Sequence, residues 1–157
     1  MAMTLFDTNI FIDLLTGCPQ AAIELTSYPE PALSVITLLE LRAGEMPRPN
    51  DKAILDQLLE TFTVLPLDED VTLKAISIRG NSLILPPKIK IADAIIGATA
   101  EAWSIPIITR NPRDFHKLTV PVHVPYDWDS KIGVVSNIRP PLGSQVGAAK
   151  SGFVRIK

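Results

Sequence analysis

The stretch Met-Thr-Leu-Phe-Asp-Thr-Asn, residues 3–9, decides how the rest of the chain is interpreted. Its first four residues form a short, largely apolar run of the kind that a buried strand requires. Asp7 follows at once, and residues 8–15 then have a helical pattern that Gly17 and Pro19 end. We therefore expect Asp7 at the carboxyl end of a first strand, which is the edge where open α/β sheets bind ligands. The alternative is that Asp7 only caps the helix that follows it.

Short apolar runs continue to alternate with longer helical stretches along the chain. Strands are predicted at residues 3–6, 32–35, 63–66, 106–109 and 120–124. Helices are predicted at residues 8–15, 21–27, 36–43, 52–60, 71–78 and 91–103. This order indicates right-handed crossovers within one sheet. The predicted fold class is α/β, with three layers (α/β/α) and a central, mainly parallel sheet of four to five strands.

The length and composition restrict the class of protein. A chain of 157 residues fits one domain with one core. No apolar run reaches the roughly 20 residues of a membrane span, and the first residues lack the layout of a signal peptide, so we expect a soluble, cytoplasmic protein with no membrane partner. Cys18 is the only cysteine and there are two histidines, which excludes an internal disulfide and argues against a metal site rich in Cys or His.

The composition changes after residue 130. Residues 131–157 are rich in Gly, Pro and Ser, and they hold five basic residues and no acid. Because the whole chain has a formal charge of −2, residues 1–130 carry −7. The sequence therefore predicts a folded domain of residues 1–130 and a basic C-terminal extension of residues 131–157. An acidic domain is a poor match for binding nucleic acid by bulk charge, unless something neutralises its carboxylates.

Two further acids lie in apolar helical stretches. Glu40 is the one charge in Ile-Thr-Leu-Leu-Glu-Leu, residues 36–41, and Asp93 stands among Ile and Ala residues. A carboxylate in such surroundings loses hydration unless another group compensates it. The alternatives are a capping box, since Thr37 and Glu40 have the Thr-x-x-Glu spacing, and a helix that begins with Asp93 as its cap.

The predicted strand at residues 106–109 leads into a polar segment, Arg-Asn-Pro-Arg-Asp, at the same edge of the sheet. Asp114 in this segment is either a fourth acid of one cluster or a surface charge paired with Arg113 or Arg110. Clustered carboxylates repel one another, and a hard divalent cation with oxygen ligands is the simplest group that neutralises them. The scarcity of Cys and His favours Mg²⁺, with Mn²⁺ as the other choice, and such ions suit phosphodiester hydrolysis.

Four stretches of the chain resemble the motif blocks of PIN-domain ribonucleases, and in particular those of VapC-type toxins of bacterial toxin–antitoxin pairs. They are Leu-Phe-Asp-Thr-Asn at 5–9, Ser-Val-Ile-Thr-Leu-Leu-Glu-Leu-Arg-Ala-Gly at 34–44, Ile-Ala-Asp-Ala-Ile-Ile-Gly-Ala-Thr-Ala at 91–100 and Thr-Arg-Asn-Pro-Arg-Asp-Phe at 109–115. Each block is weak alone, but the four occur in the order and spacing of the family.

The resemblance implies a PIN-like nuclease domain in residues 1–130 and a Mg²⁺-dependent endoribonuclease, the toxin of a type II pair, that leaves 5′-phosphate and 3′-hydroxyl ends. It implies three kinds of partner: an RNA substrate, a cognate antitoxin whose tail enters the acidic cleft, and a second copy in a homodimer. The apolar surface of helices 21–27 and 52–60 agrees with self-association.

By motif position, Asp7, Glu40 and Asp93 correspond to the metal-binding acids of the family. Some relatives have an acid where this chain has Asn111, so either Asp114 completes the catalytic set or three acids work with an amide. Thr8, Asn9 and Thr109 correspond to polar groups that orient ligands or water in the family. Arg110 and Arg113 lie beside the cleft and are candidates for RNA phosphate contacts, with ordinary surface pairing as the alternative.

Two rival classes stay open. An aspartyl-phosphate protein, such as a receiver or haloacid-dehalogenase-like domain, also has an acid after its first strand. It needs a second acid nearby and a strand-end lysine, whereas this chain has Asn9, Ile10 and Arg110 there. The other rival is a catalytically weak PIN-like module that binds RNA or protein, which chelator-sensitive cleavage would separate from an enzyme.

Overall fold

The computed structural model describes residues 3–143 and has one central sheet. Its five strands lie in the order β3-β2-β1-β4-β5, and every neighbouring pair is parallel. Their bounds are β1 (Thr4–Phe6), β2 (Pro31–Ser34), β3 (Thr63–Leu65), β4 (Ile107–Ile108) and β5 (Val122–His123). The central strand β1 pairs Leu5 with Ala32 of β2 and with Ile107 of β4.

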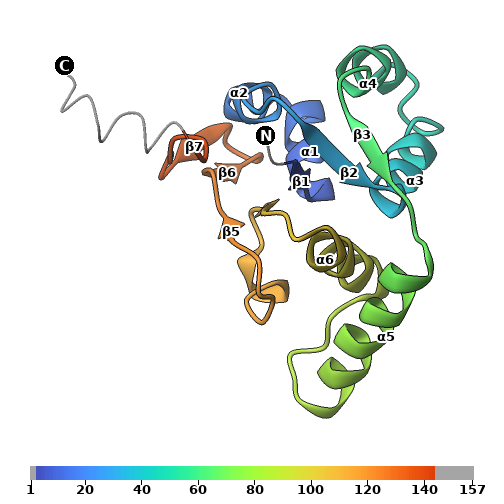
Figure 1. Ribbon diagram of the computed structural model, residues 1–157. Coiled ribbons are helices and arrows are strands. Elements are labelled where there is room, and N and C mark those ends of the chain that lie inside the picture. Colours follow the sequence, from blue (N-terminus) through green and yellow to red (C-terminus); the bar gives the residue numbers. More distant parts are fainter. Residues whose placement is uncertain (1–2, 144–157) are drawn as a thin grey trace.

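Helices connect these strands and cover both faces of the sheet (Figure 1). They are α1 (Thr8–Leu15), α2 (Pro19–Leu25), α3 (Val35–Gly44), α4 (Asp51–Leu59), α5 (Glu69–Ile84), α6 (Ile91–Trp103) and the short 3₁₀ helix η1 (Pro112–Asp114). The α/β class, the three layers and the parallel sheet of five strands are as predicted.

Alternate residues of each strand face opposite layers, which explains why the strands read as continuous apolar runs. Phe6, Leu33 and Ile108 belong to one buried cluster, and their neighbours Leu5, Ala32 and Ile107 belong to another. The strands β1, β2 and β4 are therefore buried on both faces.

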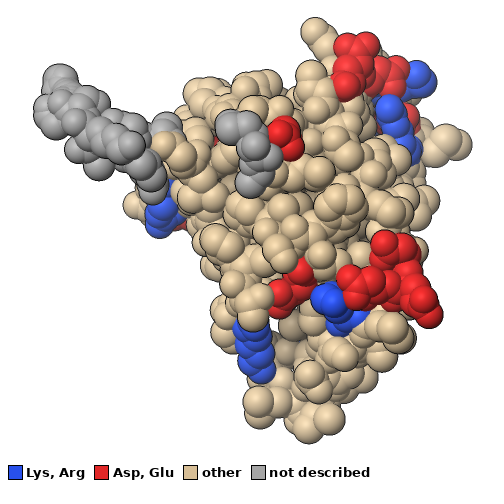
Figure 2. Space-filling view, viewed as in Figure 1, with Lys and Arg blue, Asp and Glu red and all other residues tan. Residues whose placement is uncertain are grey.

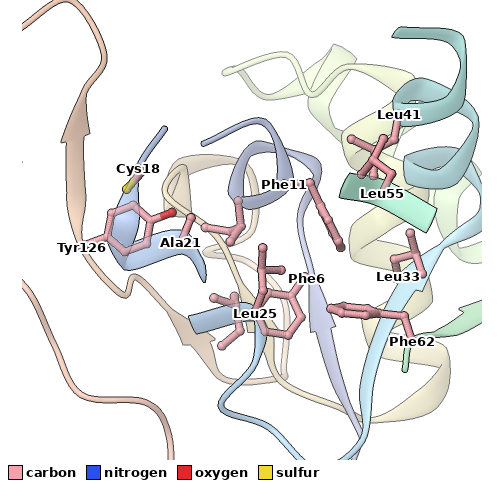
Figure 3. Close-up of a cluster of buried hydrophobic side chains, with 12 residues drawn as sticks. Phe6, Phe11, Cys18, Ala21, Leu25, Leu33, Leu41, Leu55, Phe62 and Tyr126 are labelled. Carbon is pink, nitrogen blue, oxygen red and sulfur yellow. The ribbon is translucent and has the colours of Figure 1, made fainter. Parts of the chain in front are cut away.

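The first cluster joins the sheet to α1, α2 and α4. Figure 3 shows Phe6 and Leu33 from the strands beside Phe11 of α1 and Phe62, which precedes β3. The rings of Phe6 and Phe62 lie 5.7 Å apart, and those of Phe11 and Phe62 lie 5.3 Å apart. Such tilted aromatic pairs stabilise a core by about 1 kcal/mol each beyond their buried area.

On the other face, α6 packs against the sheet and α5 packs against α6. Ile96 and Ala100 of α6 meet the strands in the second cluster, whereas Ala94, Ile95 and Ala98 meet α5 in a third. A helix enclosed between a sheet and another helix must be apolar on most sides, as the sequence of α6 is. Within residues 3–143, no helix combines the length and apolar character that crossing a membrane requires.

Several element bounds differ from the prediction. The helix predicted at 71–78 runs from Glu69 to Ile84, with Asp68 as its cap, and Gly80 lies inside it. Glycine costs a helix about 1 kcal/mol relative to alanine, a cost that packing against α6 offsets. The strand predicted at 120–124 contains two residues, Val122 and His123.

The chain after β5 forms a hairpin of β6 (Asp127–Asp129) and β7 (Val134–Ser136), which pair antiparallel. Trp128, Val135 and Leu142 pack against the first core cluster. The boundary expected between residues 130 and 131 thus falls inside this hairpin, and the part of the extension up to residue 143 contacts the domain. Residues 144–157 of the expected extension lie outside the described residues.

Charged side chains form separate groups on the face in Figure 2, with uncharged surface between them. One group covers α4, where acids and bases lie side by side, in agreement with the ion pairs Arg42–Asp56 and Lys52–Asp56. Exposed pairs of this kind add little stability, about 0 to 1 kcal/mol each.

Candidate active site

Asp7 and Thr109 lie side by side at the carboxyl edge of the sheet, directly after the adjacent strands β1 and β4. Both residues are buried, and the Thr109 hydroxyl donates a hydrogen bond to Asp7 Oδ2 at 2.7 Å. The Asn9 amide donates to the same carboxylate oxygen and to Thr109 Oγ1, each at 3.3 Å. These donors fix the orientation of the Asp7 carboxyl group.

Asp7 is at the same time the N-cap of α1, because its Oδ1 accepts a hydrogen bond from Thr8 N at 2.8 Å. The capping role and the site at the sheet edge therefore use different oxygens of one carboxylate. Oδ1 serves the helix, and Oδ2 faces Asn9 and Thr109.

Glu40 comes from α3 and reaches the same edge. The Thr8 hydroxyl donates to Glu40 Oε1 at 2.9 Å, and it also lies 2.8 Å from the Thr37 hydroxyl. The alternative of a capping box is wrong, because Ser34 caps α3 by accepting a bond from Ile36 N. Glu40 is exposed, and it points into a cleft rather than into the interior.

Asp93 lies in the first turn of α6 and is half-buried. It is not the helix cap, which is Lys90. When protonated, its carboxyl group donates a hydrogen bond to that of Asp114, and Asn111 donates its amide to Asp114 Oδ2 at 2.7 Å. Asn111 and Asp114 are therefore hydrogen-bonded to each other at the fourth motif position, and neither ion pair considered for Asp114 with Arg110 or Arg113 is present within residues 3–143.

These side chains surround one cleft of about 280 Å³, here called the acidic cleft. The residues that line it are Asp7, Thr8, Asn9, Ile12, Glu40, Lys90, Ala92, Asp93 and Asn111. Sequence reasoning missed Lys90, which stands immediately before the third motif block. A lysine next to a helical pattern is ordinary on a surface, so no signal in the sequence marks it.

Two acids of this cleft, Asp7 and Asp93, resist ionisation. Burial raises the pKa of Asp7 from 3.8 to about 6, and the charges of Asp93 and Glu40 add to the rise, while the Thr109 hydrogen bond opposes it. Burial also raises the pKa of Asp93 to about 6. The charge and hydrogen bond of Asp114 are the next largest causes of this rise, and the charge of Lys90 opposes it. The cleft thus holds negative charge that the protein compensates only in part.

The donors present are oxygens of carboxylates, hydroxyls and amides, which suit a hard divalent cation. Within residues 3–143, however, no three Asp, Glu, His or Cys side chains stand as a ready-made set of metal ligands. The chemistry of the donors fits such a cation, and the carboxylates would have to draw together around it.

Arg110 does not face the acidic cleft. Its guanidinium binds the Asp13 carboxylate through two nitrogens, one of them at 2.7 Å from Oδ1, and the buried Tyr126 hydroxyl donates to Asp13 Oδ2 at 2.8 Å. Arg110 therefore forms an ion pair, as the alternative to an RNA phosphate contact predicted, although its partner is Asp13. By contrast, the exposed Arg113 guanidinium makes no ion pair within the described part of the chain.

Comparisons with known proteins agree with this geometry. The family model described as PIN domain matches residues 4–120. A chain of a toxin–antitoxin complex from Klebsiella pneumoniae is 33% identical, with a TM-score of 0.67, and the match covers 79% of this chain and 98% of that one. FitAcB from Neisseria gonorrhoeae is 30% identical, with a TM-score of 0.68, over 78% and 97% of the two chains.

A third structure, VapBC2 from Rickettsia felis bound to a DNA fragment from its promoter, is 19% identical with a TM-score of 0.69, over 77% of this chain and 97% of that one. At that identity it supports the fold alone. The comparison with curated proteins gives no match. The family model spans most of the chain and its motif acids gather at one edge of the sheet, so the chain belongs to the PIN domain family.

Proposed function

We propose that the protein is the toxin of a type II toxin–antitoxin pair and that it hydrolyses RNA phosphodiester bonds with Mg²⁺, Mn²⁺ being the other suitable ion. One observation carries the proposal: Asp7, Glu40 and Asp93, from three distant segments, line one cleft. There the pKa of both Asp7 and Asp93 is raised to about 6. Perturbed carboxyl groups that converge in a cleft are typical of catalytic sites.

In this proposal Asp7 and Asp93 hold the cation, and Glu40 either binds it directly or holds one of its waters. A bound divalent ion of this kind polarises the phosphate and activates water for attack. The neighbouring side chains position the acids: Thr109 and Asn9 orient Asp7, and Thr8 orients Glu40. Asn111 holds Asp114 against Asp93, so that Asp114 adjusts the charge and geometry of the site.

The second candidate is a catalytically weak PIN-like module that binds RNA or protein. One observation favours it: within residues 3–143 the acids do not form a ready-made set of metal ligands. A module that keeps the fold and has lost the metal would retain the cleft without the chemistry.

Partners follow from the relatives and from the surface. The Klebsiella relative belongs to a toxin–antitoxin complex, and an antitoxin partner in the cytoplasm is proposed for this chain on that basis. A homodimer is also proposed, because exposed apolar side chains favour self-association. They are more numerous on α5 and the loop after it than on α2 or α4. Those on α5 and its loop are Leu73, Ile76, Leu83, Ile84 and Leu85.

The test is RNA cleavage by the purified full chain. We expect end-labelled RNA to be cut with Mg²⁺ and left intact with EDTA, and Asp93→Asn to lower the rate about 100-fold or more. Asp70→Asn is the matched control, because Asp70 lies on the exposed start of α5 in a surface pair with Lys74. Cleavage that survives EDTA would refute the metal dependence, and full activity of Asp93→Asn would refute the role proposed for Asp93. RNA binding with no cleavage would support the module instead.

A further inference from the structure

A second cavity lies beside the acidic cleft. It has a volume of about 160 Å³ and lies between the later part of α5 and the segment that follows β4, both at the lower end of the view in Figure 1. Asp114, whose carboxyl group contacts that of Asp93, is one of the residues lining it. A ligand in this cavity would thus lie next to the acids of the candidate active site.

The walls of the cavity differ in chemistry. Ile78, Ile89 and Leu118 give it an apolar lining, with Ile89 buried and the other two half-buried. Four polar groups of the lining already have partners. Ser82 Oγ accepts a bond from Ile89 N at 3.0 Å, Glu101 accepts bonds from Thr119, Asp114 accepts from Asn111, and the His116 ring bonds the Arg113 carbonyl. The Asn81 side chain, in contrast, makes no hydrogen bond with any described residue, and its amide can both donate and accept.

Two cations stand at the side of the cavity that the segment after β4 provides. Arg113 and Lys117 line it, both are exposed, and neither takes part in an ion pair within residues 3–143. Arg42, Arg48, Lys52 and Lys74 pair with acids, whereas other cations of the described residues, such as Lys88 and Lys131, also have no ion pair there. What singles out Arg113 and Lys117 is their place: they line a cavity next to an acidic centre, where they suit a ligand that carries negative charge past that centre.

The combination restricts the ligand. An apolar slot suits a flat body, the free amide of Asn81 suits a hydrogen-bonding edge, and the cations suit an anion joined to that body. A nucleotide of single-stranded RNA has these three parts, because its base can leave the stack and expose its edge while its phosphate stays outside. An acidic peptide shares the anion but has no comparable flat polar edge.

We propose that this cavity is a base-binding subsite, which holds one unstacked base of the RNA next to the bond that is cut. Asn81 hydrogen-bonds the edge of the base, and Arg113 and Lys117 contact the flanking phosphates. The inference rests on the proposed function. It means that this cavity determines which base is preferred next to the bond that is cut.

Abasic RNA tests the base contact. A set of RNA substrates, each with one abasic nucleotide at a different position around the cut, is cleaved by the wild-type chain and by Asn81→Ala. We expect an abasic nucleotide at one flanking position to slow the wild type about tenfold. Asn81→Ala should reduce that difference, and alanine also favours the helix, so the fold is kept. Equal cleavage of all abasic substrates by the wild type, or an unchanged difference in Asn81→Ala, would overturn the subsite.

Two further variants test the walls. Ser77→Trp, on the exposed side of α5, is designed to fill the cavity and should abolish the preference. Lys117→Ala should weaken RNA binding for every sequence, whereas Lys131→Ala, an equal loss of charge on the loop of the β6–β7 hairpin, should leave it unchanged. If Lys131→Ala weakens binding as much as Lys117→Ala does, the phosphate contacts are refuted.

Crosslinking separates failure of the subsite from failure of the proposed function, since it needs no cleavage. RNA with 4-thiouridine in place of every uridine is irradiated with the full chain, and the attached peptide is identified. We expect the crosslink on the segment that contains Asn81 or on residues 113–118. If the chain cuts RNA and the crosslink falls elsewhere, the subsite is wrong and the nuclease stands. If the chain does not cut, a crosslink at these segments still supports the subsite.

Discussion

At the scale of single residues, each acid of the cleft has a local structural task as well as its place in the site. Asp7 caps α1 through one oxygen and meets Thr109 through the other. Asp93 lies in the first turn of α6, where the positive end of the helix dipole favours an anion. Even so, the pKa of both groups is raised to about 6, because burial and mutual repulsion outweigh these stabilising contacts.

Replacing Asp93 by Asn should stabilise the metal-free protein at neutral pH. Because the pKa of Asp93 rises from 3.8 to about 6 on folding, ionisation costs stability progressively as the pH rises through that window. Above it, Asp93→Asn removes a charge that burial disfavours and that Asp114 and Glu40 repel, and we expect a gain of about 1 kcal/mol after allowing for solvent. Below about pH 4 the gain should vanish. Urea unfolding with EDTA at both pH values measures it, and a loss of stability at neutral pH would contradict the account.

Replacing Thr109 by Val should raise the pKa of Asp7 further. The fully buried hydroxyl donates to Asp7 and accepts from Asn111 N at 2.9 Å, and valine keeps the shape without either bond. We expect a loss of about 1 to 3 kcal/mol and a shift of the pH–rate profile to higher pH. Thr99→Val is the control, since this buried hydroxyl bonds only a carbonyl of its own helix. An unmoved profile in Thr109→Val would show that the bond does not tune Asp7.

At the scale of elements, the Asp13–Arg110 pair joins α1 to the segment after β4. Asp13 is buried, and Arg110 and Tyr126 satisfy its carboxylate. Arg110→Met would leave that charge buried with one partner fewer, so we expect a loss of about 3 kcal/mol in unfolding free energy. Arg113→Met, an equal change at an exposed position, should leave stability unaltered. A folded Arg110→Met that only binds RNA less tightly would favour the phosphate role expected from the sequence.

The helices and strands could be predicted where the pattern of apolar residues is clear. Strands such as β1 and β2 are buried on both faces and read as apolar runs, so their positions follow from the sequence. The β6–β7 hairpin was missed because its strands, Asp-Trp-Asp and Val-Val-Ser, are largely exposed and three residues long. The full length of α5 was missed because Gly80 interrupts its pattern, and only packing against α6 makes the continuation favourable.

At the scale of the whole molecule, the gathering of Asp7, Glu40 and Asn111 follows from topology. A parallel sheet brings the carboxyl ends of its strands to one edge, so the segments after β1, β2 and β4 could be placed together from the sequence. Individual partners could not be placed in this way. Whether Arg110 turns to Asp13, 97 residues away, or to Asp114 depends on side-chain geometry that no spacing records.

Residues after position 130 contact the folded core. The sequence favoured residue 130, yet Leu142 N donates to the Tyr28 hydroxyl at 2.9 Å, and Val135 and Leu142 cover the first core cluster. A chain that ends at residue 130 loses β7 and these contacts, whereas one that ends at residue 143 keeps them. We expect the shorter chain to be less stable than the longer by about 2 kcal/mol or more, because apolar contacts and the part-buried hydrogen bond between Leu142 and Tyr28 are lost together. Thermal unfolding of the two truncated chains measures the difference, with the full chain as reference. Equal midpoints would place the edge of the folded domain at residue 130 and make the hairpin an appendage.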